Sequence, residues 1–250
     1  MKEDINQSLS IDFVLFAFPR TGSNWLCTLL NSVPDIVMHY ELLHERRPFF
    51  SAKIKENPVV NTTSSERDEA PFAFLEKIKM ASPERKVGFK LFPGQNSGVQ
   101  KEILERPDIK KIILYRENIL ANFASKLFAS KTGKYFSSSS RTQESVPNEE
   151  LPEFDRHQFE SWEIFYQQWY TEISTSALRE GNTCFVVYES ISFLPAFQSV
   201  VRFLDGPVVT KMPATKHKKT GRSDVSERFS NPEDVRMYLS DRDLLRWRFD

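Results

Sequence analysis

Short apolar runs alternate along the chain with longer segments in which apolar residues recur every three or four positions. The runs are rich in β-branched and aromatic residues, which is typical of strands buried on both faces of a sheet. They fall at residues 13–18, 86–92, 109–115 and 184–188. Helical spacing is present at residues 25–33, 71–81, 101–104, 119–129, 159–173, 195–204 and 231–245. Strands that alternate with helices predict an α/β fold, with a parallel sheet and helices on both of its faces.

Two segments interrupt this alternation. Residues 44–70 mix prolines with a cluster of threonine, serine and charged residues, and residues 132–153 contain a run of four serines. Segments of this kind are typical of surface excursions and functional loops. The chain has 250 residues, which is enough for one large α/β domain. We therefore expect a single domain over residues 1–250 with excursions near 44–70 and 132–153.

The amino-acid composition of the chain argues against several classes of function. The 34 Lys and Arg residues balance the 34 Asp and Glu residues, so charge does not indicate nucleic-acid binding. The four histidines are scattered, and we expect no metal site. Cys27 and Cys184 lie within predicted elements, which indicates free thiols. The polar N-terminus and the absence of a run of about 18 apolar residues predict a cytoplasmic protein without a transmembrane segment.

The first predicted strand is followed by a polar turn, and a helix follows that turn. The first N–H groups of a helix have no partner within the helix, and this end of the helix dipole is positive. The unit is therefore suited to bind an anion. Arg20 adds a guanidinium group that can bind phosphate through two hydrogen bonds, and Thr21 and Ser23 add hydroxyl donors.

The turn lacks the glycine and lysine pattern of nucleotide kinases and the G-x-G-x-x-G pattern of dinucleotide-binding folds. Its sequence, P-R-T-G-S-N-W-L at residues 19–26, resembles the P-K-S-G-T-T-W-L loop of PAPS-dependent sulfotransferases. PAPS is 3′-phosphoadenosine 5′-phosphosulfate, the sulfuryl donor. Arginine in place of lysine is similar to the branch that contains bacterial carbohydrate sulfotransferases, such as those that act on nodulation factors and trehalose.

The resemblance implies the sulfotransferase fold, which shares the layout of P-loop kinases. It also implies PAPS as co-substrate, no metal, and direct in-line transfer to a hydroxyl group of a sugar or glycolipid acceptor. The loop would bind the 5′-phosphosulfate through Arg20, Thr21, Gly22, Ser23, Asn24 and Trp25.

A second set of residues resembles the family's 3′-phosphate site. Arg116 follows a predicted strand, at the sheet edge where ligands of parallel sheets bind, and Ser125 lies in the next helix. Their spacing of nine residues departs by one from the usual eight of the family. Near the C-terminus, Lys219, Gly221 and Arg222 resemble the basic, glycine-containing segment that closes over the adenosine and the 3′-phosphate.

Transfer to a hydroxyl group requires a base that accepts its proton. Glu41 follows the first helix, and in the bacterial carbohydrate branch a glutamate in a similar segment has this role. His39 is the alternative, because residues two apart on an extended segment share a face, and His44 is the third candidate. Lys90, at the end of a predicted strand, could reach the transferring group or remain a surface lysine.

Two further functions remain open from the sequence. One is a P-loop-like kinase or phosphotransferase that uses Mg²⁺ and ATP, which the missing Walker lysine disfavours. The other is a non-catalytic nucleotide binder on the same scaffold. Magnesium dependence separates the kinase from the sulfotransferase, and a transfer assay separates the binder from both.

Overall fold

The computed structural model describes residues 11–54, 63–83, 85–133, 150–215 and 222–250. The chain forms two compact units. The first consists of Met1–Phe18, Ser23–Tyr115 and Glu172–Pro213. The second consists of Pro19–Gly22, Arg116–Thr171 and Ala214–Asp250. The chain therefore passes between the units several times, first within the turn that follows the first strand.

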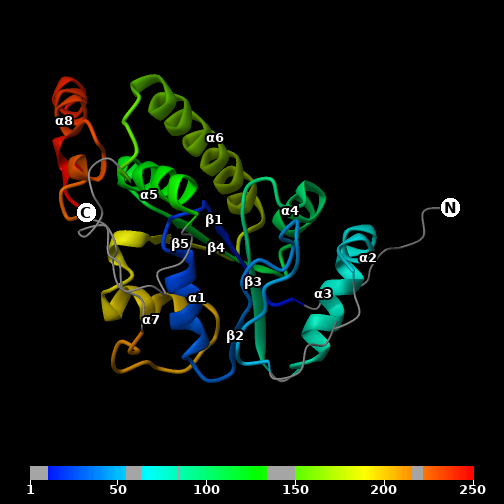
Figure 1. Cartoon of the computed structure of the whole chain (residues 1–250). Helices are drawn as coiled ribbons and strands as arrows, with labels where there is room; N and C mark the ends of the chain where they lie inside the picture. Colours follow the sequence, from blue (N-terminus) through cyan, green and yellow to red (C-terminus); the bar gives the residue numbers. More distant parts are fainter. Residues whose placement is uncertain (1–10, 55–62, 84, 134–149, 216–221) are drawn as a thin grey trace. The chain divides into compact units, whose positions relative to one another are not determined.

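The first unit contains a five-stranded sheet with the order β2-β3-β1-β4-β5, in which every pair of neighbouring strands is parallel (Figure 1). Its strands are β1 (Phe13–Ala17), β2 (Ile36–Met38), β3 (Lys86–Leu91), β4 (Lys110–Tyr115) and β5 (Thr183–Val187). In the central strand, Phe16 pairs with Leu91 of β3 and with Ile113 of β4. The carboxyl ends of β1, β3 and β4 therefore lie at one edge of the sheet, where the strand order reverses and where α/β sheets bind ligands.

Helices flank this sheet. They are α1 (Ser23–Asn31), α2 (Ser64–Glu69), α3 (Pro71–Met80), α4 (Ser97–Leu104), α7 (Leu194–Phe203) and the 3-10 helix η3 (Tyr188–Ser190). On one face, Phe13 and Leu15 of β1 pack in one core with Leu26 of α1 and Phe197 of α7. Side chains alternate between the faces of a strand, and Val14 on the other face is also fully buried. The predicted α/β fold with a parallel sheet buried on both faces is confirmed.

The second unit has a core of aromatic rings. Its helices are α5 (Ile119–Thr132), most of α6 (Arg156–Glu180), α8 (Pro232–Asp241) and the 3-10 helices η4 (Ser226–Arg228) and η5 (Leu245–Arg248). Phe159 of α6 packs against Phe123, Phe154, Tyr238 and Trp247, with ring centroids 5.3–6.4 Å apart. Phe159 of α6 is therefore part of the core of this unit.

Two side-chain helix caps are present in this unit. The Asn118 side chain accepts a hydrogen bond from the Ala121 N–H at 2.9 Å, and Asp155 accepts one from the Gln158 N–H at 2.7 Å. Such caps satisfy N–H groups that have no partner within the helix. No helix within the described ranges combines the length and the apolar character that a membrane crossing requires.

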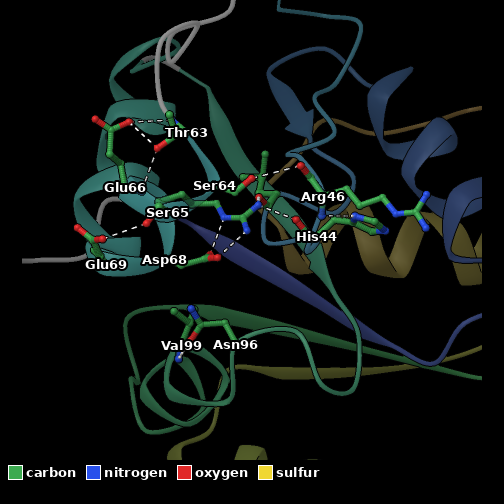
Figure 2. A network of polar contacts seen from close by, with 12 residues as sticks. His44, Arg46, Thr63, Ser64, Ser65, Glu66, Asp68, Glu69, Asn96 and Val99 are labelled. Carbon is green, nitrogen blue, oxygen red and sulfur yellow. Dashed lines mark hydrogen bonds and ion pairs between the residues drawn. The ribbon is translucent and has the colours of Figure 1, made fainter.

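Within the described ranges, strand β2 and helix α2 are among the elements that the sequence did not predict. Strand β2 has only three residues and pairs with β3 alone, so its apolar pattern is too short to be distinctive. Helix α2 lies within the excursion expected at residues 44–70. Its signal is a capping box, in which the Thr63 side chain accepts from the Glu66 N–H and the Glu66 carboxylate accepts from the Thr63 N–H (Figure 2).

Candidate active site

The turn after β1 has an unusual backbone. Arg20 and Gly22 have φ angles of 68° and 78°, with Thr21 between them, and α1 begins at Ser23. Turns with left-handed residues direct backbone N–H groups into a concavity that can bind an anion, as the start of a helix also does. The two left-handed residues thus lie in the turn that the sequence predicted as the phosphosulfate loop, and anion binding there stays a prediction.

Three contacts in the second unit hold this turn. The Asn122 Nδ2–H donates to the Pro19 carbonyl at 2.7 Å, and the Arg116 Nη1–H donates to the Arg20 carbonyl at 3.2 Å. The Arg20 Nε–H donates to Ser125 Oγ at 2.9 Å. A left-handed conformation costs about 1–2 kcal/mol for a residue other than glycine, so these contacts offset a real strain at Arg20. Asn122 was not among the predicted site residues, because its contact with Pro19 depends on long-range folding.

Arg116 lies in a closed ionic cluster. Its side chain is buried, and Nη2 lies 2.5 Å from Asp250 Oδ2, which is also 2.7 Å from Arg228 Nη2. The Tyr166 hydroxyl accepts from the Arg116 N–H at 2.9 Å and donates to the Arg116 carbonyl at 3.0 Å. Burial alone would raise the pKa of Asp250, but the guanidinium groups of Arg116 and Arg228 lower that pKa well below its usual value. Asp250 and Arg228 were not among the predicted site residues.

The structure therefore brings both predicted 3′-phosphate residues of this region, Arg116 and Ser125, into contact with Arg20. Of the predicted C-terminal residues, Lys219 and Gly221 lie outside the described residues. Arg222 donates from Nη1 to the Glu227 carbonyl at 2.9 Å, and its own carbonyl accepts from the Arg228 Nε–H at 2.8 Å. Arg222 is thus held within its own segment.

The first unit contains a second polar cluster, around Lys90 near the end of β3. The Lys90 side chain is 1% exposed. Its Nζ donates to Asn24 Oδ1 at 2.6 Å and lies 3.0 Å from Glu41 Oε1. The other oxygen of Glu41 accepts from the Gln95 Nε2–H at 2.9 Å. Asn24 of the predicted phosphosulfate loop and Glu41, the predicted base, therefore both contact the buried ammonium group of Lys90.

The segment that carries Glu41 is held by backbone contacts. The Tyr40 N–H donates to the Phe49 carbonyl and the Phe49 N–H donates to the Glu41 carbonyl, both at 3.1 Å. From α2, the buried Arg67 donates from Nη1 to the His44 carbonyl at 2.6 Å. Figure 2 shows this polar network between α2 and the segment around His44. The position of Glu41 therefore depends on residues 44–70, for which the sequence predicted a surface excursion.

The two histidine candidates differ in surroundings. His39 is fully buried, its Nδ1 accepts from the Ser51 N–H at 3.2 Å, and burial lowers its pKa to about 4. The imidazole is therefore neutral at neutral pH and carries its proton on Nε2. His44 accepts from the Arg46 N–H at 3.2 Å and packs edge-on against Phe49.

Trp25 and Cys27 lie in α1. The Trp25 ring packs edge-on against Tyr188 with centroids 6.2 Å apart, at the margin of the core of the first unit. Burial raises the pKa of the Cys27 thiol to about 12, so that the thiol is neutral. Within the described part of the chain, no three His, Cys, Asp or Glu side chains gather in a way that could hold a metal ion.

Comparison with known proteins gives structural matches only. No family model matches the chain, and no curated protein matches it. A sulfotransferase from Alicyclobacillus acidocaldarius is 19% identical, with a TM-score of 0.49 over 95% of this chain and 98% of that one. The mouse sulfotransferase SULT7A1, crystallised with PAP, is 12% identical, with a TM-score of 0.45 over 81% of this chain. The match spans 61% of the mouse chain, which is less than two thirds of its length.

Proposed function

We propose that this chain is a PAPS-dependent sulfotransferase that transfers a sulfuryl group to an acceptor hydroxyl. The observation that carries the proposal is the left-handed backbone at Arg20, which contacts from Arg116, Asn122 and Ser125 hold in place. Strain that is maintained by surrounding side chains is typical of functional sites. A turn of this geometry before a helix is suited to a phosphate or phosphosulfate group.

The residues present fit the donor. Residues 20–24 supply one guanidinium group, hydroxyl groups and the first N–H groups of α1, all of which favour the 5′-phosphosulfate. The predicted ligands of the 3′-phosphate remain Ser125, Lys219, Gly221 and Arg222. Arg116 remains a predicted ligand as well, and its contact with the Arg20 carbonyl supports an additional role in holding the loop.

Glu41 is the base in this proposal. The acceptor oxygen attacks sulfur, the bond between sulfur and the bridging oxygen breaks, and adenosine 3′,5′-bisphosphate (PAP) leaves with the bonding electrons. Glu41 takes the proton of the acceptor hydroxyl. The ion pair with Lys90, which also contacts Asn24, supports this role because it ties the carboxylate to a loop residue. The neutral, fully buried His39 is the weaker candidate.

For the acceptor we propose a sugar hydroxyl, on the basis of the loop motif. The rings of Phe92 and Tyr40 lie 4.4 Å and 5.8 Å from Lys90 Nζ, and both are half-buried. They supply apolar surface beside the proposed base. Transfer from radiolabelled PAPS to trehalose, compared with transfer to p-nitrophenol, tests the sugar assignment. Label on the phenol alone would contradict it.

Thermal unfolding with PAP tests the donor assignment. A ligand present at about 1,000 times its dissociation constant stabilises the folded state by roughly 4 kcal/mol. We expect PAP to stabilise the parent chain and the Arg46→Ala control, whose side chain is 84% exposed, and to stabilise Arg20→Ala far less. Stabilisation by Mg-ADP but not by PAP would overturn the proposal in favour of a kinase. Binding of PAP without transfer to any hydroxyl acceptor would indicate a non-catalytic binder.

A further inference from the structure

The contacts of Glu41 identify a residue that the motif does not contain. Each oxygen of the Glu41 carboxylate has a different partner, Lys90 Nζ at 3.0 Å for Oε1 and Gln95 Nε2 at 2.9 Å for Oε2. We propose that Gln95 is a positioning residue, which fixes the orientation of the Glu41 carboxylate. The inference rests on the proposed role of Glu41 as the base.

The Gln95 amide has one orientation that satisfies both of its ends. Its Oε1 accepts a hydrogen bond from the Phe92 N–H at 3.1 Å, so the NH₂ end is the one that faces Glu41. A rotated amide would lose the bond to Phe92 and place its oxygen against the Glu41 carboxylate. The side chain is therefore a donor with a defined direction.

The backbone around Gln95 is equally well defined. The Gln95 N–H donates to the Phe92 carbonyl at 3.2 Å across a turn with Pro93 second and Gly94 third, and Gly94 has a φ of 79°. Proline followed by a residue of positive φ is the pattern of a type II turn. Directly after Gln95, Asn96 caps α4 by accepting from the Val99 N–H at 3.0 Å (Figure 2). Gln95 thus lies between a rigid turn and a helix cap.

A neutral donor such as Gln95 can give the Glu41 carboxylate a preferred orientation, which the other groups near it do not. Lys90 of β3 contributes a positive charge, and the Cys27 thiol of α1 is neutral because burial raises its pKa to about 12. The phenol of Tyr40, the preceding residue, lies 3.5 Å from the hydroxyl of Thr28. Lys90 alone would attract either oxygen of the carboxylate. The directed bond from Gln95 selects one orientation.

The test follows the chemical shift of the Glu41 side-chain carboxyl carbon by NMR at neutral pH in isotope-labelled full-length protein. The Glu41→Gln variant identifies the signal, so no acceptor has to be known. We expect Gln95→Leu to shift this signal, because the directed hydrogen bond to one carboxylate oxygen is lost. The isosteric Gln95→Glu replaces the donor by a like charge and should shift the signal as well. Gln100→Leu, in α4, is the control and should leave the signal unchanged.

An unchanged Glu41 signal in both folded Gln95 variants would overturn the inference. Gly94→Ala provides a second route, because a Cβ at this position meets no atom within 4 Å and only the positive φ is strained. It should move the signal in the same direction as Gln95→Leu. Failure of the proposed function is detected separately, as a lack of stabilisation by PAP in the parent chain.

Discussion

Arg116 and Lys90 are two buried cations, one in each compact unit. Arg116 comes directly after β4, and Lys90 is the penultimate residue of β3. Each pairs with a carboxylate and contacts a residue of the loop at residues 19–24. Arg116 donates to the Arg20 carbonyl, and Lys90 donates to Asn24 Oδ1.

The two ion pairs differ in what surrounds the carboxylate. The Asp250 side chain is 2% exposed and lies between the guanidinium groups of Arg116 and Arg228. The Glu41 side chain is 16% exposed and has one cation and one neutral amide as partners. A carboxylate closed off between two cations cannot exchange protons with a ligand at neutral pH. The same kind of pair therefore serves structure in one unit, and in the other it supports the acid–base role that we propose for Glu41.

The largest expected effect is that of Asp250→Asn on stability. Removal of one partner from a buried ion pair costs about 3–5 kcal/mol, because the remaining charges are left uncompensated. We expect a loss of this size in the free energy of unfolding, measured by urea denaturation, and a smaller loss for Glu41→Gln, because Lys90 Nζ keeps its contact with Asn24 and the new amide oxygen can still accept from it. Equal losses in the two variants would remove the distinction between the pairs.

The effect of Asp250→Asn on stability should depend on pH. The folded-state pKa of Asp250 is lowered, so its stabilisation is present above the unfolded carboxyl value of about 3.9 and is lost as pH falls below it. The difference in stability between the parent chain and Asp250→Asn should therefore shrink below about pH 4. A constant difference down to low pH would show that Asp250 does not act through its charge.

His39→Asn sharpens the comparison by testing burial next to Glu41. The pKa of His39 falls from 6.5 to about 4 on folding, so the unfolded state binds the proton more tightly between these values. The parent chain should lose up to about 3 kcal/mol of stability as pH falls through this window, and the variant should lack this dependence. Chemical denaturation at pH values across the window measures the loss, and identical profiles would contradict the assignment.

Lys90→Met should have a smaller effect on stability than Asp250→Asn. Methionine occupies a similar volume, Glu41 keeps its bond from Gln95, and its partial exposure permits hydration of the freed charge. We expect a loss of about 1–2 kcal/mol in the free energy of unfolding, near the value of one charged hydrogen bond. A loss as large as that of Asp250→Asn would place the Glu41 pair in the same structural class.

The sequence by itself determined four of the five described strands and most of the helices that flank them. Apolar runs such as residues 13–18 must be buried wherever they lie, and their alternation with helical segments leaves few arrangements besides a parallel sheet. The sequence also determines local helix caps, because the Asn118 and Asp155 side chains each accept a hydrogen bond from an N–H group three residues later. The turn at residues 19–24 was predicted for the same reason, since its chemistry depends on adjacent residues.

Only the tertiary structure decided which side chains meet at these elements. Ser125 lies 105 residues from Arg20, and neither sequence position indicates that they share a hydrogen bond. The partner of Arg116, Asp250, and the partner of Glu41, Gln95, had no local pattern either. Periodicity reports which face of an element is buried, but pairing between distant polar groups depends on chain packing. That packing separates a closed ion pair from an accessible one, and it decides the chemistry available at each cation.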